Sequence, residues 1–247
     1  MDLAALRLCR TPAAALAALA LSAAAAPALA GTVLFSDDFQ STVVKPVWSS
    51  NTTINTQSAS NFTWFAGRYS DNNGITLSLT APAAPIGFDN SNNGDSGGGS
   101  GGSGNNGGLR NTYTLSFDFY CIDSWDGNDP NYGPDRFTVT HNNTTTLFNE
   151  SFGNVYPIQS FRAPTIGPAN LGFSTAFPDS IYRKILVKFD TPDNQPYTLR
   201  FASLGLQNID DESWGIDNVR VIVDVVPAPS SLALLGGSGL LAFRRRR

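Results

Sequence analysis

An alternating pattern between Thr112 and Ile122 constrains the fold of this chain more than any other feature. The segment reads TYTLSFDFYCI, and its core-type residues fall at every second position: Tyr113, Leu115, Phe117, Phe119 and Cys121. Successive side chains of a β-strand point to opposite faces, so these residues share one face. We therefore expect a strand with this face in a hydrophobic core and the Cys121 thiol buried within it.

Shorter patterns of the same kind recur along the middle of the chain, separated by Gly, Asn, Asp and Pro, which favour turns. They cover residues 33–39, 62–69, 75–80, 136–141, 181–189, 197–203 and 215–223. No long segment keeps the period of a helix. The sequence therefore predicts an all-β fold, a single β-sandwich of jelly-roll type over residues 31–226. A signal helix and a short hydrophobic helix are expected to flank it.

The segment 89–108 contains only Asp, Asn, Ser and Gly. It has no apolar side chain to bury, so we expect a disordered loop that joins two strands of one domain. Its Gly and Ser residues match short serine-hydrolase and nucleotide-binding motifs. Both motifs require a following helix, whereas a strand is expected here, so we attribute the matches to composition.

The first 30 residues are typical of a signal peptide. Arg7 and Arg10 precede an Ala/Leu-rich run, and residues 28–30 read Ala-Leu-Ala, the small-x-small pattern that signal peptidase cleaves. Cleavage after Ala30 would export the chain and remove Cys9. The mature chain would then hold Cys121 as its single cysteine, without an internal disulfide.

The C-terminal segment combines a proline motif, an apolar run and an arginine cluster. It begins with Val226, Pro227, Ala228 and Pro229 and ends with Arg244, Arg245, Arg246 and Arg247. The apolar run over 232–243 is shorter than the roughly 20 residues that span a bilayer as a helix. The arginines would remain on the cytoplasmic side of the membrane.

This tail, over residues 227–247, resembles the PEP-CTERM sorting signal of Gram-negative bacteria, with Ala228 where the motif has glutamate. The resemblance implies transient membrane insertion of the C-terminal helix and cleavage by an exosortase-like membrane protease. It also implies delivery to the cell envelope, the outer surface or the extracellular matrix.

Charge and composition limit the partners of the chain. It carries 16 Lys and Arg and 20 Asp and Glu, and several of the basic residues lie in the two terminal segments. The acidic middle cannot neutralise many phosphates, which argues against nucleic acid as a partner. A single histidine, His141, leaves no cluster for zinc. Ca²⁺, which prefers oxygen ligands, is the metal that fits best.

One candidate Ca²⁺ site is the acidic loop after the 112–122 strand. It contains Asp123, Asp126 and Asn128. Carboxylates so close in sequence repel one another unless a cation compensates them. The alternative interpretation is a solvated turn.

A second candidate Ca²⁺ site joins the ends of the domain through Asp38 and Asp217. Asp217 has the same parity as Val219 in the last predicted strand, so we expect it on the core face, where a carboxylate needs a partner. An ion pair with Arg68 or Arg220 is the alternative. The arrangement resembles the cation-holding ends of MAM-like and carbohydrate-binding jelly rolls.

Trp125 lies in the polar loop and is the candidate for stacking on a sugar ring, whereas Trp64 and Trp214 are expected in the core. Asp123, Asp126 and Asn128 would then contact sugar hydroxyls. We therefore expect a non-catalytic exported protein that binds extracellular polysaccharide. A purely structural envelope or matrix protein is the main alternative. A glycoside hydrolase that pairs Asp126 with the acids of 210–212 is a further one.

Overall fold

The computed structural model describes residues 31–56, 61–71, 73–83 and 110–223. The expected signal peptide, the 89–108 loop and the tail from Val226 onwards lie outside these residues, as do the two expected flanking helices. The described residues form strands and connecting segments without a helix, so the all-β prediction is confirmed for them. None of them belongs to a helix long and apolar enough to cross a membrane.

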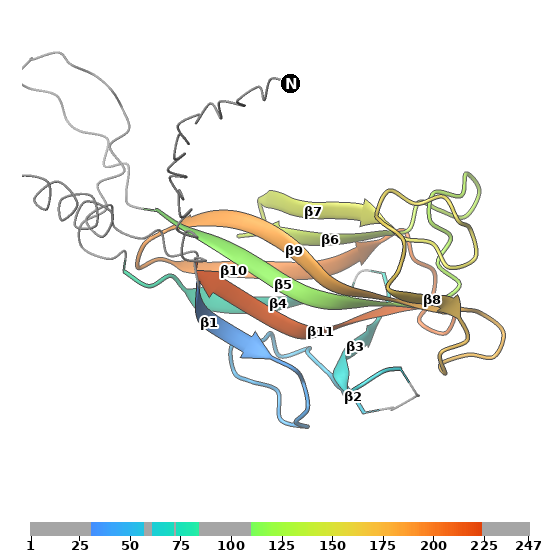
Figure 1. The fold of residues 1–247 in the computed structure, drawn as a ribbon, viewed down its shortest axis with the longest axis horizontal. Coiled ribbons are helices and arrows are strands. Elements are labelled where there is room, and N and C mark those ends of the chain that lie inside the picture. Colours follow the sequence, from blue (N-terminus) through green and yellow to red (C-terminus); the bar gives the residue numbers. More distant parts are fainter. Residues whose placement is uncertain (1–30, 57–60, 72, 84–109, 224–247) are drawn as a thin grey trace, which may run out of the picture.

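The strands form two antiparallel sheets (Figure 1). The seven-stranded sheet has the order β2-β3-β11-β5-β9-β8, and β1 pairs with β11. Its strands are β1 (Thr32–Asp37), β2 (Ile54–Asn55), β3 (Phe65–Tyr69), β5 (Arg110–Asp123), β8 (Ile166–Ala169), β9 (Asp179–Pro192) and β11 (Glu212–Val223). The four-stranded sheet has the order β4-β10-β6-β7, with β4 (Gly74–Thr80), β6 (Arg136–His141), β7 (Thr145–Ser151) and β10 (Pro196–Leu204).

Each strand predicted from the sequence is present, with shifts of a few residues at its ends. The sequence patterns did not reveal β2, β7 and β8. The edge strand β7 explains why, because most of its residues are exposed or half-buried and its sequence TTLFNES lacks an apolar alternation.

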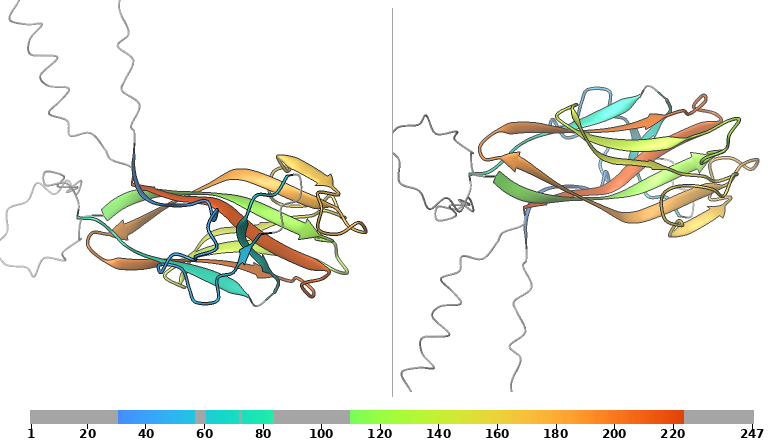
Figure 2. Two further views of the ribbon diagram at one scale, coloured as in Figure 1. Left: turned by 90° about the horizontal axis from the view of Figure 1, so that it is seen from below. Right: turned by 90° about the horizontal axis from the view of Figure 1, so that it is seen from above.

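The main core fills the space between the two sheets, which Figure 2 shows as two layers. The five alternating residues of β5, Tyr113 to Cys121, are all fully buried there, as predicted. Aromatic rings join the layers: Phe117 of β5 lies 5.5 Å from Phe201 of β10, and Phe137 of β6 lies 5.1 Å from Trp214 of β11, between ring centroids. The prediction that Cys121 and Trp214 lie in the core is therefore confirmed, whereas Trp64, which was also predicted there, is half-buried and belongs to neither core cluster.

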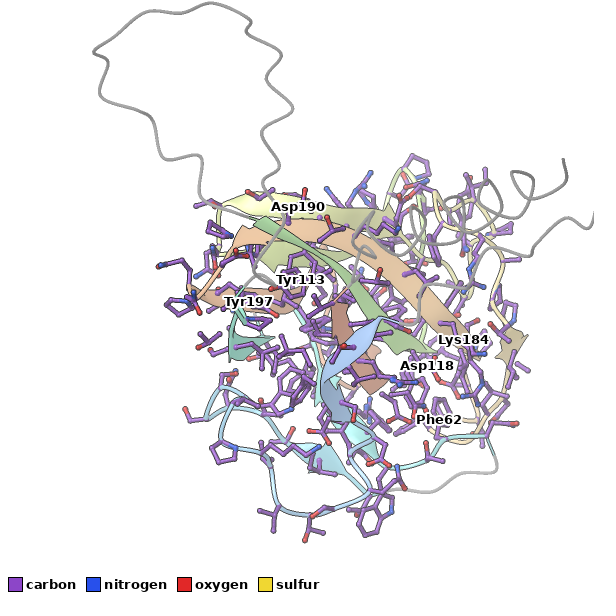
Figure 3. The ribbon with its side chains drawn as sticks, turned by 60° about the vertical axis from the view of Figure 1, so that its left-hand side comes forward. Phe62, Tyr113, Asp118, Lys184, Asp190 and Tyr197 are labelled. Carbon is purple, nitrogen blue, oxygen red and sulfur yellow. The ribbon has the colours of Figure 1, made fainter. Side chains whose placement is uncertain are left out.

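A second, smaller core covers the outer face of the seven-stranded sheet. Phe62, which is labelled in Figure 3, packs there against Tyr120 with ring centroids 5.0 Å apart. The other buried members of the cluster are Phe65, Ile122, Leu171 and Ile181. The strand β5 is therefore buried on both faces at its C-terminal half. The sequence shows one apolar face only, because Tyr120 and Asp118 occupy the other.

Asp118, in the middle of β5, lies between two β-bulges, one in β9 and one in β11. The register shifts between Phe117 and Phe119 against β9, and between Asp217 and Arg220 against β11. The Asp118 carboxylate accepts hydrogen bonds from the Lys184 N–H at 2.7 Å and from Asn218 Nδ2 at 3.0 Å, and both of these residues have positive φ. Figure 3 labels Asp118 and Lys184. Asp118 thus satisfies the Lys184 N–H, which the bulge in β9 removes from the ladder, and it holds the side chain of Asn218 at the other bulge.

The bulge at Asn218 changes the parity of β11. Trp214 and Ile216 face the main core before it, and Val219, Val221 and Val223 face the same core after it. Asp217 therefore points to the outer face, so the prediction that it shares the face of Val219 is wrong. An inserted residue moves every preceding side chain to the opposite face, and no sequence pattern marks its position here.

We predict that Phe119→Ala lowers the free energy of unfolding by about 3–5 kcal/mol, because it leaves a cavity in the main core. Phe119 is fully buried, and its ring centroid lies 4.3 Å from that of Phe137 and 4.6 Å from that of Phe152. Leu186→Ala on β9, whose side chain is 66% exposed, should change the free energy by at most about 0.5 kcal/mol. Urea unfolding followed by tryptophan fluorescence measures both. Equal losses in the two variants would contradict this placement of the core.

Candidate functional site at the acidic end of the sheets

Acidic residues gather where β5 ends and β11 begins, at the right-hand end of Figure 1. The loop after β5 leads into β6 through Asp126 and Asp135, and β11 starts at Glu212. One oxygen from each of Asp126, Asp135 and Glu212 lies within 4.8 Å of the others. We call these three residues the carboxylate triad.

Backbone hydrogen bonds hold the loop 126–135 closed. The Asp135 N–H donates to the Gly127 carbonyl at 2.8 Å, and the Asp129 N–H donates to the Asp126 carbonyl at 3.0 Å. Gly127 has φ of 60°, and a Cβ there would lie 2.5 Å from the Ile158 carbonyl oxygen. Only glycine fits this position, so the sequence Asp126-Gly127 is what allows the loop to bring Asp135 back beside Asp126.

Burial and mutual repulsion dominate the electrostatics of the triad. Asp135 and Glu212 are fully buried, and Asp126 is partly exposed. Burial raises the pKa of Asp135 to about 7. The hydrogen bond that its carboxylate accepts from the Asp126 N–H acts in the opposite direction and lowers the pKa. Burial, together with the charges of Asp135 and Asp126, raises the pKa of Glu212 to about 8. The Glu212 carboxylate accepts the Gln207 N–H at 2.7 Å, and the side-chain amide of Gln207 is placed to donate to both of its oxygens.

Asp123 belongs to a different group, although it is the register partner of Glu212. Its φ is 68°, and its carboxylate forms an ion pair with Arg68 at 3.2 Å. Burial and the nearby charge of Asp179 raise its pKa to about 6, and Arg68 acts in the opposite direction. The structure therefore separates Asp123 from Asp126, which the sequence placed in one site.

Trp125 lies in the main core and is fully buried. Its indole Nε1 donates to the Ser213 carbonyl at 2.8 Å, and its ring lies 5.6 Å from Phe119, between centroids. Stacking on a sugar needs an exposed ring face, so this burial removes Trp125 from the candidate contacts. The polar neighbours of Trp125 in the sequence concealed its position, because they form the loop around it.

The second predicted site, Asp38 with Asp217, has a different chemistry. The Asp217 carboxylate accepts hydrogen bonds from Thr63 Oγ1 at 2.7 Å and from the Tyr120 hydroxyl at 2.9 Å. These donors fill the role expected for a cation or for Arg68. Asp38 is exposed, and its Oδ1 accepts the Gln40 N–H at 3.3 Å.

Tyr132 is an exposed aromatic residue on the loop 126–135 that the sequence analysis did not single out. Its side chain is 68% exposed, and its N–H donates to Asp129 Oδ1 at 3.1 Å. Asn128 is partly exposed on the same loop, and its N–H donates to the Ile158 carbonyl at 2.7 Å. The sequence could have indicated this residue, because a tyrosine inside a loop rich in Asp, Gly and Pro is expected to be exposed.

No protein-family model matches the chain, and no curated protein matches its sequence. Among solved structures, the fold is similar to dimeric latent PorU from Porphyromonas gingivalis, with 13% identity and a TM-score of 0.35, over 81% of this chain and 13% of the PorU chain. It is also similar to the K1 cleaved adhesin domain of Lys-gingipain from Porphyromonas gingivalis W83. That match has 11% identity and a TM-score of 0.34, over 77% of this chain and 98% of the other. Matches at this level define neither a family nor a function for the chain.

The triad makes the metal-free protein lose stability as pH rises. The folded-state pKa values of Asp135 and Glu212, about 7 and about 8, lie above the ordinary values of 3.8 and 4.5, so the folded chain binds more protons than the unfolded chain. This contribution is complete below the ordinary values and is lost as pH rises through the raised ones. We predict that, in EDTA, the free energy of unfolding falls between about pH 4 and pH 8 and levels off above that range.

Urea unfolding at several pH values measures this slope. Glu212→Gln removes one of the titrating groups and should make the dependence on pH shallower, whereas Asp210→Asn, outside the triad, should leave it unchanged. A wild-type stability that is constant or rises over this range in EDTA would contradict the prediction.

Proposed function

We propose that the protein is a non-catalytic, exported β-sandwich of the jelly-roll type that binds extracellular carbohydrate at its acidic end. The strand order supports the jelly-roll assignment, because the chain crosses repeatedly between the sheets: from β3 to β4, β4 to β5, β5 to β6, β7 to β8, β9 to β10 and β10 to β11. In such folds, loops at the ends of the sheets carry binding residues on a rigid scaffold.

The observation that carries this proposal is the exposed ring of Tyr132 on a hydrogen-bonded loop. Aromatic faces stack on sugar rings, and neighbouring polar groups bind the hydroxyls. Asn128 and Asp126 are partly exposed on the same loop and supply such groups. Tyr132 thus takes the stacking role that the sequence alone assigned to Trp125.

The terminal sequences support export. The N-terminal 30 residues have the features of a signal peptide, and the tail from Pro227 resembles the PEP-CTERM signal. On this proposal, signal peptidase and an exosortase-like protease process the chain. The protein then acts at the envelope, at the outer surface or in the extracellular matrix of a Gram-negative bacterium, with polysaccharide as its partner.

Burial of the carboxylates argues against the alternative of a glycoside hydrolase. Such an enzyme needs two carboxyl groups that flank the bond of a bound sugar. Asp126 and Glu212 do come together, but Glu212 and Asp135 are fully buried and offer no surface to a sugar chain. The arrangement favours binding over catalysis.

We predict that the purified protein is retarded in native gels cast with one class of acidic or neutral polysaccharide in the presence of Ca²⁺. Tyr132→Ala should weaken this binding by roughly two- to tenfold, because it removes a ring contact worth about 0.5–1.5 kcal/mol. Tyr132→Phe keeps the ring and should bind like the wild type.

Leu186→Ala is the matched control, because Leu186 is 66% exposed and Tyr132 is 68% exposed. Its binding should equal that of the wild type. Free migration of the wild type in every gel would favour the purely structural envelope protein instead. If the wild type released reducing sugar from a polysaccharide and Asp126→Asn abolished this release, the result would favour the hydrolase.

A further inference from the structure

No cationic side chain of the part of the chain that the structure describes forms a salt bridge with the carboxylate triad. Within the described residues, the salt bridges involve Asp37, Asp118 and Asp123, and none reaches the triad. The charged neighbours that raise the pKa of Asp126, namely Asp129 and Asp211, are acidic as well. Three carboxylates so close together repel one another strongly in a buried site unless a proton or a cation lies between them.

An unpaired oxygen provides a second, independent indication of a missing ligand. Asp135 is fully buried, and its Oδ2 accepts the Asp126 N–H, but its Oδ1 has no hydrogen-bond partner. The large majority of buried side-chain polar atoms in folded proteins have a hydrogen-bond partner. A bound ion would supply the partner that the protein itself does not provide.

The backbone, rather than flexible side chains, sets the position of the triad. Closure of the loop 126–135 fixes Asp126 relative to Asp135 through the Gly127 carbonyl, and strand pairing with β5 fixes Glu212 at the start of β11. A Cβ on Gly133 would lie 2.7 Å from the Gly127 carbonyl oxygen, so a side chain there would force the loop open. The carboxylates are therefore arranged before any ligand binds, which reduces the cost of binding.

We propose that Asp126, Asp135 and Glu212 bind one Ca²⁺ ion, which links the loop after β5 to the start of β11. All donors are oxygens, which suits a hard cation, and Ca²⁺ accepts six to eight oxygen ligands in flexible geometry. Partly exposed Asp126 lets the ion enter and leaves room for water ligands. This proposal does not depend on carbohydrate binding, because the ion would stabilise the fold with or without a sugar.

Terbium luminescence of the purified full chain tests the site directly. Tb³⁺ occupies Ca²⁺ sites, and Trp125 is the indole to sensitise its emission, because it directly precedes Asp126 and donates to the carbonyl of Ser213, next to Glu212. We expect saturable emission at one ion per chain, and Ca²⁺ should displace it at a concentration at least about tenfold lower than Mg²⁺ does. Absence of emission, or equal displacement by Mg²⁺, would overturn the proposal.

Variants locate the ion. Glu212→Gln should weaken Tb³⁺ and Ca²⁺ binding at least about tenfold, and Asp126→Asn, at the partly exposed position, should do the same if Glu212→Gln fails to fold. Asp210→Asn removes the same charge nearby, and Asp38→Asn alters the other predicted site. Both should bind like the wild type. Loss of binding in Asp38→Asn with full binding in Asp126→Asn would overturn the assignment.

Thermal melting at fixed pH gives a readout independent of terbium. A ligand that binds only the folded chain raises Tm, and Ca²⁺ at about 100 times its Kd should raise it by about 5–10 °C relative to EDTA. Asp126→Asn should lose this shift, whereas Asp210→Asn should keep it. An equal Tm in Ca²⁺ and EDTA for the wild type would exclude the site. Retardation in polysaccharide gels is scored separately, so either proposal can fail alone.

Discussion

The antiparallel pairing of β5 with β11 is the constraint on which the rest of the structure depends. It runs from Tyr113–Val223 at one end to Asp123–Glu212 at the other, in the middle of the seven-stranded sheet. The same pairing directs the aromatic side chains of β5 and β11 towards the four-stranded sheet. It also places the start of β11 beside the loop after β5. The carboxylate triad is therefore a consequence of how the core closes. A change in register would disrupt the core and the triad together.

Local patterns in the sequence predicted the part of the fold that repeats over short distances. The alternation of Tyr113 to Cys121 gave the central strand and its buried face, and Trp214 was placed correctly in the core. The jelly-roll type is a prediction that the strand order supports. Local patterns failed where one residue changes the geometry. The bulge at Asn218 reverses the face of Asp217, and the turn after Asp123 directs Trp125 inwards.

The sequence indicated the kind of ligand atoms at the candidate site, but it did not indicate which residues form the site. The acidic loop after β5 indicated oxygen ligands, and Asp126 is indeed one of the triad. Glu212 joins it from a distant part of the chain through strand pairing, and Asp135 joins it through the closure of a glycine-dependent loop. Asp123 leaves it because Arg68 holds its carboxylate elsewhere. These are tertiary effects, which no local spacing of residues encodes. An ion at the triad would hold the loop that presents Tyr132, which gives the two proposals a common structural basis.

A crystal structure of the protein grown with Ca²⁺, with anomalous scattering data, would show whether the carboxylate triad binds an ion. We expect a single anomalous peak within about 2.3–2.6 Å of oxygens from Asp126, Asp135 and Glu212. The proposed Ca²⁺ site would be contradicted if the triad showed no peak and the carboxyl groups of Asp135 and Glu212 shared a direct hydrogen bond. A peak between Asp38 and Asp217, with none at the triad, would contradict it equally.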